Sequence, residues 1–133
     1  MLFLKIFFNF LFQLLIENTA IECKEYALTR PFIPGTFTNA SKLFNCPVRL
    51  PDLVILLNTL DTSAKENLII TECAKLRIPT VGIVDTNCDP SLITYAVPGN
   101  DDSYTAISLY CKLFKTAILR GKEKREQFMT IKN

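Results

Sequence analysis

The sequence predicts an α/β fold, a three-layer sandwich in which helices cover both faces of a mostly parallel sheet of about five strands. Two observations support this class. Residues 53–57 and 80–84 are almost continuously apolar, which is typical of strands buried on both faces. Predicted strands also alternate with predicted helices, and this order favours parallel strands joined by helical crossovers. With 133 residues, 49% of them hydrophobic, the chain is expected to form one domain with its own core.

The first sixteen residues are strongly apolar and allow three interpretations. A secretory signal is disfavoured, because residues 17–20 do not supply a small-residue cleavage site. A membrane anchor would need about 20 apolar residues, and polar residues interrupt this shorter run. Such an anchor should project from the domain as a lone helix. We favour the third interpretation, a buried strand over residues 2–7 and a turn at Asn9, followed by a helix over residues 10–25.

Spacing and turn residues predict the elements that follow in the first half of the chain. The helix over residues 10–25 should direct one apolar stripe toward the core. That stripe consists of Leu11, Leu14, Leu15, Ala20 and Ile21. The next expected elements are a short strand at 26–29, a loop at 30–37 and a short helix that runs from the caps Thr38 and Asn39 to Phe44.

The second half of the chain predicts three strands, at residues 53–57, 80–84 and 93–97, and two helices. The capping-box spacing of Ser63 and Glu66 begins a helix that ends near Arg77. Its expected stripe is Leu68, Ile69, Glu72 and Leu76. The last helix begins at residues 100–103, and its expected core stripe is Ile107, Tyr110, Cys111, Phe114, Ala117 and Ile118. For the sheet we expect the flavodoxin-like order 2-1-3-4-5. The domain should span residues 1–120, with a basic C-terminal tail over 121–133.

The composition disfavours most catalytic chemistry. The chain contains no histidine, which removes the commonest general base and metal ligand and excludes a Ser-His-Asp or Cys-His arrangement within it. Only four glycines are present, in no phosphate-loop pattern. The five cysteines form no CxxC pair, so we interpret them as reduced structural thiols. We therefore expect no enzymatic activity, no cofactor and no metal.

An acidic cluster supports an alternative hypothesis. Asp85 follows a predicted buried strand, and Asp101 and Asp102 begin the last helix, so all three could meet at the carboxyl edge of the sheet, where open α/β folds bind ligands. A flavodoxin-like ligand-binding or enzyme module with an acidic site would then have a deep pocket there. The structural interpretation is that Asp85 forms a turn and the other two cap the helix.

Basic residues gather in two regions, although the net charge is only +2. The first region is the loop segment around Phe32 and Phe37, whose rings could stack on unpaired bases but are more often core residues. Its candidates for RNA contact are Arg30, Thr38, Asn39, Lys42 and Arg49. The second region is the last helix and the residues after it, where cations could neutralise phosphates. Its candidates are Lys112, Lys115, Arg120, Lys122, Lys124 and Arg125.

Five stretches in the same order resemble one family. They are residues 32–39 (FIPGTFTN), 50–55 (LPDLVI), 72–79 (ECAKLRIP), 80–87 (TVGIVDTN) and 97–103 (VPGNDDS). Together they resemble the small-subunit ribosomal protein S-two family. Residues 87–95 and 109–114 resemble its animal mitochondrial branch.

The resemblance implies a structural constituent of the small subunit of the mitochondrial ribosome, in the mitochondrial matrix, without catalytic activity. Its implied partners are small-subunit ribosomal RNA and other small-subunit ribosomal proteins. We expect no DNA, no membrane and no homo-oligomer as partners. Bacterial members of the family sit between the head and the body of the subunit.

The sequence departs from the family pattern in three places. Pro34 replaces the first glycine of the aromatic-x-Gly-Gly loop. The long helical hairpin that bacterial members insert after the Thr-Asn motif is absent, since only residues 40–50 join the flanking motifs. The family's region before the first strand is also missing, so the chain resembles a truncated member.

Overall fold

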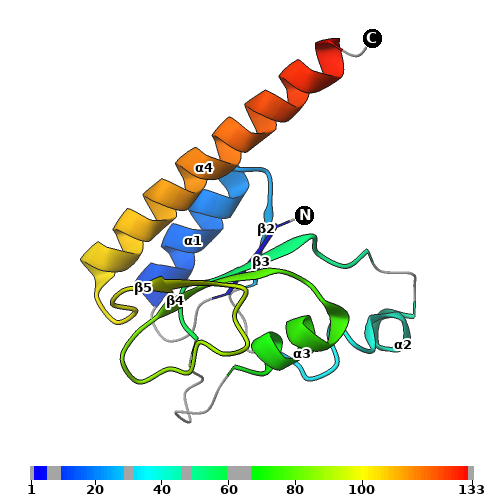
Figure 1. Ribbon diagram of the computed structural model, residues 1–133, viewed down its shortest axis with the longest axis vertical. Coiled ribbons are helices and arrows are strands. Elements are labelled where there is room, and N and C mark those ends of the chain that lie inside the picture. Colours follow the sequence, from blue (N-terminus) through cyan, green and yellow to red (C-terminus); the bar gives the residue numbers. More distant parts are fainter. Residues whose placement is uncertain (1, 6–9, 29–31, 46–48, 60–66, 132–133) are drawn as a thin grey trace.

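A parallel sheet with helices on both faces forms the protein in a computed structural model that describes residues 2–5, 10–28, 32–45, 49–59 and 67–131 (Figure 1). The predicted α/β class and the parallel sheet are therefore confirmed. The strands are β1 (Leu2–Lys5), β2 (Tyr26–Leu28), β3 (Leu53–Leu56), β4 (Thr80–Val84) and β5 (Tyr95–Pro98). The helices are α1 (Phe10–Glu22), α2 (Ala40–Phe44), α3 (Leu68–Leu76) and α4 (Tyr104–Ile131).

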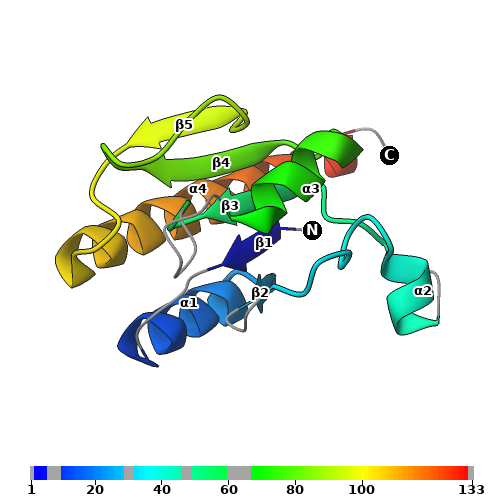
Figure 2. The ribbon, with the colours of Figure 1, turned by 90° about the horizontal axis from the view of Figure 1, so that it is seen from below.

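The strands pair in the order β2-β1-β3-β4-β5, and each pairing is parallel (Figure 2). In β1, Leu4 pairs with Ala27 on one side and with Ile55 on the other. The start of the chain is thus a strand inside the sheet, which contradicts the alternative that it is a lone anchoring helix. Among the described residues, no helix combines the length and apolar character that a membrane span requires.

Two hydrophobic cores lie on opposite faces of the sheet, because successive residues of a strand point to opposite faces. Val54 and Leu56 belong to the core under α3, whereas Ile55 belongs to the core under α1 and α4. The first core consists of Phe32, Phe37, Val54, Leu56, Ile69, Ile70, Cys73, Ile78 and Ile93. The second consists of Ile16, Ile55, Leu57, Ile83, Ile107 and Cys111. This arrangement explains why β3 is apolar without alternation.

The buried face of α1 differs from the predicted stripe. Leu14 and Ile21 are 48% and 71% exposed, so the prediction for these two was wrong. The face that packs against the sheet and α4 carries Ala20, as predicted, together with Ile16 and Cys23, which were not predicted; the three are spaced by four and three residues. Because α1 is apolar around most of its circumference, its sequence pattern cannot select the buried side, and tertiary packing decides it. Leu11 lies outside the residues whose side chains are described.

Helix ends also differ in detail from the prediction. The side chain of Asn39 makes no capping hydrogen bond to α2. Asn67 caps α3 by accepting a hydrogen bond from the Ile69 N–H at 3.3 Å, while Ser63 and Glu66 lie outside the described residues. Arg77 ends α3 in the left-handed region with φ 56°, just before Pro79.

Three further corrections concern the second half of the chain. Strand β5 begins at Tyr95, two residues later than predicted. On α3, Leu68 is exposed although it was placed in the core stripe, and on α4 Ala117 is exposed as well. Both residues lie at the margin of their helix's buried stripe, where spacing alone does not distinguish core from solvent.

Helix α4 is one continuous helix of 28 residues. The segment expected as a tail after residue 120 continues this helix to Ile131 and projects beyond the rest of the domain (Figure 1). Straight-chain and charged residues of high helix propensity dominate residues 122–129, which explains why the helix does not end where its packing against the sheet ends.

Candidate nucleic-acid interface

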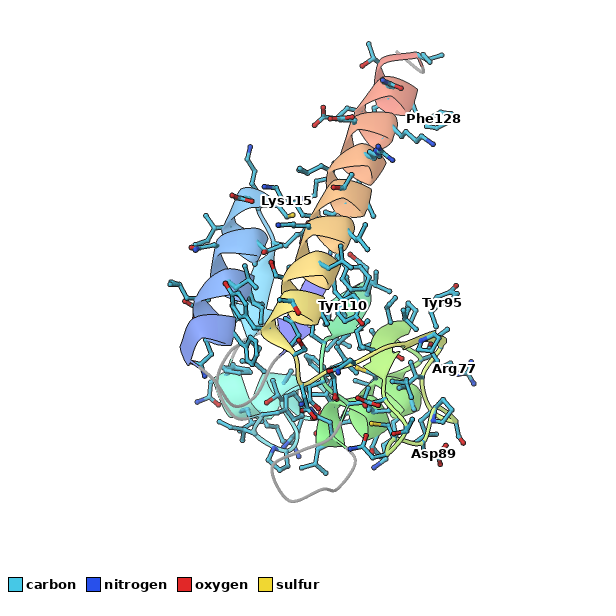
Figure 3. The ribbon with its side chains drawn as sticks, turned by 90° about the vertical axis from the view of Figure 1, so that its left-hand side faces the viewer. Arg77, Asp89, Tyr95, Tyr110, Lys115 and Phe128 are labelled. Carbon is cyan, nitrogen blue, oxygen red and sulfur yellow. The ribbon has the colours of Figure 1, made fainter. Side chains whose placement is uncertain are left out.

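Helix α4 is attached to α1 at both ends of their contact. Near the start of the two helices, the rings of Phe12 and Tyr104 stack with centroids 5.7 Å apart. Further along, Lys115 forms an ion pair with Glu22, and Figure 3 shows Lys115 on the side of α4 that faces α1. Lys122 lies 2.6 Å from a carboxylate oxygen of Glu25 and donates to the Cys23 carbonyl at 2.5 Å. Two of the six basic candidates on α4 therefore serve contacts within the chain.

The other four basic candidates on α4 are exposed. These are Lys112, Arg120, Lys124 and Arg125. At about 100° per residue, Arg120, Lys124 and Phe128 follow one another along one side of the helix, with Arg125 beside them. Glu126 falls on the side opposite Lys124, whereas Glu123 lies about 60° from Arg120 and borders the cations.

Apolar side chains accompany these cations on the projecting end. Phe128 is 73% exposed and Ile131 is 82% exposed, and Figure 3 shows Phe128 well away from the sheet. They line an open surface together with Gly121, Lys124, Arg125 and Met129. A contiguous exposed patch of this kind marks an interaction surface more often than a solvated one.

The two aromatic candidates of the loop region are buried, unlike Phe128 at the end of α4. Phe32 and Phe37 are 8% and 6% exposed, and their rings pack 5.3 Å apart in the first core. The hypothesis that they stack on bases is therefore wrong, and the core interpretation is confirmed. Both rings face the apolar surface of α3, so burial there outweighs exposure to a partner.

The polar candidates of this loop region are exposed. They are Thr38, Asn39, Lys42 and Arg49. Thr38, Asn39 and Lys42 lie together because α2 begins directly after Asn39. Arg49 forms a solvent-exposed ion pair with Asp52 at 3.2 Å. Arg30 lies outside the described residues. Figure 1 shows α2 well separated from the projecting end of α4, so the two regions of candidates form separate surfaces.

The contacts of one buried acidic residue were missed in the sequence. Glu72 was assigned to the apolar stripe of α3, and it is indeed only 8% exposed. Its carboxylate accepts hydrogen bonds from the backbone N–H groups of Gly35, Phe37 and Thr38. The signal available in advance was an acidic residue inside a buried helix face, which requires hydrogen-bond donors from another part of the chain.

The acidic residues at the sheet edge have structural roles. Asp85 accepts from the Thr86 N–H at 2.6 Å. Asn100 accepts from the N–H groups of Asp102 and Ser103 at 2.8 and 3.0 Å and so satisfies backbone donors just before α4. Asp101 is buried, and its burial, together with the charges of Asp102 and Asp85, raises its pKa above the ordinary 3.8.

We expect Asp101→Asn to stabilise the protein at neutral pH. Because the pKa of Asp101 is raised on folding, the folded state loses stability as pH rises from 3.8 through the raised value, and the deficit persists above it. The asparagine variant cannot ionise and so avoids this deficit. Thermal unfolding should give a higher Tm for the variant at pH 7 and equal values below pH 3.8.

Asp89→Asn is a control for which we expect a change in Tm of the opposite sign. Hydrogen bonds from the Ser91 side chain and backbone lower the pKa of Asp89, so its charge contributes stability above the ordinary pKa. This variant should lower the Tm at pH 7. A fall in Tm for Asp101→Asn as well would show that the Asp101 carboxylate makes a stabilising contact, contrary to our expectation.

The three buried cysteines of the described residues lack the features of reactive thiols. Cys23, Cys73, Cys88 and Cys111 are free, and all but Cys88 are buried. Burial raises the pKa of the Cys73 thiol to about 12 and that of Cys111 to about 11, so both stay protonated near neutral pH. Within the described part of the chain, no cluster of three or more Cys, Asp or Glu side chains could hold a metal ion.

The fold and surface define an α/β domain that exposes a basic, partly apolar helix at one end. The family model described as ribosomal protein S2 matches residues 47–121, more than half of the chain. The chain belongs to the ribosomal protein S2 family, which confirms the resemblance found in the sequence. The comparisons do not support the alternative of a flavodoxin-like module with an acidic site.

Sequence identity to individual proteins supports the same family. The chain is 56% identical over 116 residues to small ribosomal subunit protein uS2m of Bos taurus, an alignment that covers 87% of this chain and 40% of the relative. It is 45% identical over 82 residues to uS2 of Bartonella tribocorum, covering 62% and 29%. It is 44% identical over 77 residues to uS2 of Campylobacter jejuni, covering 58% and 28%. The chain thus spans less than half the length of these relatives.

Proposed function

We propose that the protein is a structural constituent of the small subunit of the mitochondrial ribosome, located in the matrix, and that it supports translation without catalysing a reaction. The observation that carries the proposal is the 56% identity to uS2m over 116 residues, well above the identity to the bacterial uS2 relatives. The lack of histidine and of a phosphate loop agrees with a role in assembly rather than catalysis.

We propose that RNA meets two surfaces of the domain. The α4 surface consists of Lys112, Arg120, Lys124 and Arg125, and the loop surface consists of Thr38, Asn39, Lys42 and Arg49, with Arg30 kept as a candidate from the sequence. Exposed cations on a rigid helix release counterions when they meet phosphates, which supplies most of the affinity for RNA. Hydroxyl and amide side chains in a fixed loop can hydrogen-bond to phosphate and sugar.

Neighbouring ribosomal proteins are the proposed partners of the apolar part of the α4 end. Phe128, Met129 and Ile131 are all more than half exposed, and apolar side chains at that density are expected to be covered in an assembly. DNA, membranes and further copies of the chain are not among the partners that we propose. We also propose that residues 1–120 form one domain of about five strands in the order 2-1-3-4-5, with residues 121–133 as a basic extension.

Affinity purification of the tagged chain from mitochondria tests the proposal. We expect the chain to co-purify with small-subunit ribosomal RNA and to sediment with the small subunit in a sucrose gradient. A tagged mitochondrial matrix protein of similar size provides the background level. Recovery of the intact, folded chain only at the top of the gradient, without small-subunit RNA above that background, would contradict the proposed function.

A further inference from the structure

Glu72 connects α3 to the loop before α2. Its carboxylate accepts from the Phe37 N–H at 3.0 Å and from the Thr38 N–H at 3.2 Å, and its second oxygen accepts from the Gly35 N–H. Three backbone donors from one short loop thus converge on one side chain that lies 34–37 residues away in sequence. Converging N–H groups of this kind form a concave anion-binding site, and here the anion is part of the protein.

Both partners of this contact are held in place. On the α3 side, the neighbours Ile69, Ile70 and Cys73 are buried in the first core, so the backbone that carries Glu72 is fixed. On the loop side, Phe32 and Phe37 are anchored in the same core. A charged acceptor with this little freedom makes hydrogen bonds that are stronger than neutral ones.

The loop's remaining donors are also satisfied. The Thr36 N–H donates to the Ile33 carbonyl at 3.1 Å, and the Asn39 N–H donates to the Gly35 carbonyl at 2.8 Å. Every backbone N–H from residue 35 to residue 39 therefore has an acceptor inside the protein. A phosphate approaching this loop can be met by the side chains of Thr38 and Asn39 but not by backbone donors.

This contact also explains why Pro34 is tolerated where the family has glycine. Proline lacks an N–H, but Glu72 uses the N–H groups of residues 35, 37 and 38 and none from residue 34. Gly35 keeps the left-handed conformation, with φ 87°, that turns the chain toward Glu72. The departure at residue 34 therefore leaves the loop's contact with α3 intact.

We propose that Glu72 is a positioning residue, an internal anion that fixes the loop of residues 35–39 so that Thr38 and Asn39 face RNA. It occupies the place that a phosphate would otherwise take on these N–H groups, and so it limits the loop to recognition through side chains. The proposal rests on the proposed function, because it names what holds one of the two RNA-facing surfaces in shape.

The direction in which Glu72→Gln changes RNA affinity distinguishes positioning from a simple effect of charge. Removing a negative charge from an RNA-binding surface ordinarily leaves RNA affinity unchanged or strengthens it. If Glu72 fixes the loop, Glu72→Gln should instead weaken association with RNA. The affinity gained from removing one negative charge is then smaller than the affinity lost when the loop becomes less ordered. A weakening therefore separates positioning from simple charge.

Hydrogen exchange on the purified full chain tests the loop directly. In Glu72→Gln the amides of residues 35, 37 and 38 should exchange about tenfold faster than in the wild type, whereas amides of α4 keep their rates. In Glu72→Ala, acetate or formate should restore part of the protection, and chloride at equal ionic strength should not. Unchanged exchange at these amides in both variants would overturn the proposal, whatever the protein's function.

Incorporation into the small ribosomal subunit tests the second part of the proposal, that the fixed loop contributes to RNA binding. We expect Glu72→Gln to incorporate severalfold less than the wild type in mitochondria. Glu126→Gln, on the side of α4 opposite Lys124, makes the same charge change and should incorporate normally. Ile83→Val, in the second core, controls for a general loss of stability.

The outcomes of the two experiments distinguish the two proposals. Wild-type chain that fails to sediment with the subunit would refute the proposed function, while the exchange rates still decide whether Glu72 fixes the loop. A Glu72→Gln variant with a loosened loop and normal incorporation would refute the positioning role alone.

Discussion

Replacing Arg120, Lys124 and Arg125 together by alanine is expected to weaken association with small-subunit RNA on the order of a hundredfold at about 0.1 M salt. All three side chains are exposed on the projecting part of α4, where they can reach phosphates without leaving contacts in the domain. Each lost phosphate contact should also lower the slope of log affinity against log salt by somewhat less than one. Filter binding or gradient sedimentation at several salt concentrations measures both quantities.

Lys75→Ala is the matched control for Lys124→Ala. Lys75 is also an exposed helical lysine, but it lies on α3, outside both proposed RNA surfaces. We expect Lys124→Ala to weaken binding severalfold and Lys75→Ala to have little effect, with both variants as stable as the wild type. Equal sedimentation of the triple variant and the wild type with the small subunit would exclude this surface as an RNA contact.

Replacing Ile55 by alanine, or Leu56 by alanine, is expected to destabilise the fold by about 3 kcal/mol in each case. The two residues are neighbours in β3 and are 3% and 0% exposed, yet they belong to different cores. A sheet with one solvated face would lose stability at only one of two successive positions. Here both should lose it, since helices cover both faces. Urea unfolding should show a lower midpoint with a similar slope for both variants.

Ile21→Ala is the control for these two variants. Ile21 was predicted as a core residue of α1, but it is largely exposed, so its truncation should change the free energy of unfolding by less than about 0.5 kcal/mol. A loss near 3 kcal/mol at Ile21, or a negligible loss at either Ile55 or Leu56, would contradict the two-sided core.

The sheet could be predicted because burial on both faces leaves a direct mark on sequence. Residues 53–57 and 80–84 are apolar without alternation, and both predicted positions match strands to within one residue. The buried side of α1 could not be predicted in the same way. Ile16, which is fully buried, and Ile21, which is not, are the same residue type in a helix that is apolar nearly all round.

The RNA-facing candidates were predicted from charge, and charge does not reveal the partner. Lys115 and Lys122 look like the other cations of α4 in sequence, but carboxylates of Glu22 and Glu25 happen to lie beside them in the fold. Glu72 was missed for the related reason that its donors lie on a distant loop. Contacts between segments far apart in the chain depend on the tertiary fold, and local spacing contains no information about them.

The length of α4 sets a fixed distance between the domain and whatever binds its tip. At about 1.5 Å per residue, the part of α4 from Gly121 to Ile131 spans roughly 16 Å, so it acts as a rigid spacer between the domain and the tip. Its angular setting is fixed as well. One inserted residue after Gly121 would rotate Phe128 by about 100° about the helix axis and turn it away from the protein proposed to bind it. Seven inserted residues would nearly restore the direction of Phe128 and move the tip about 10 Å outward. The direction in which the tip points is therefore far less sensitive to substitutions along the helix than to single insertions or deletions.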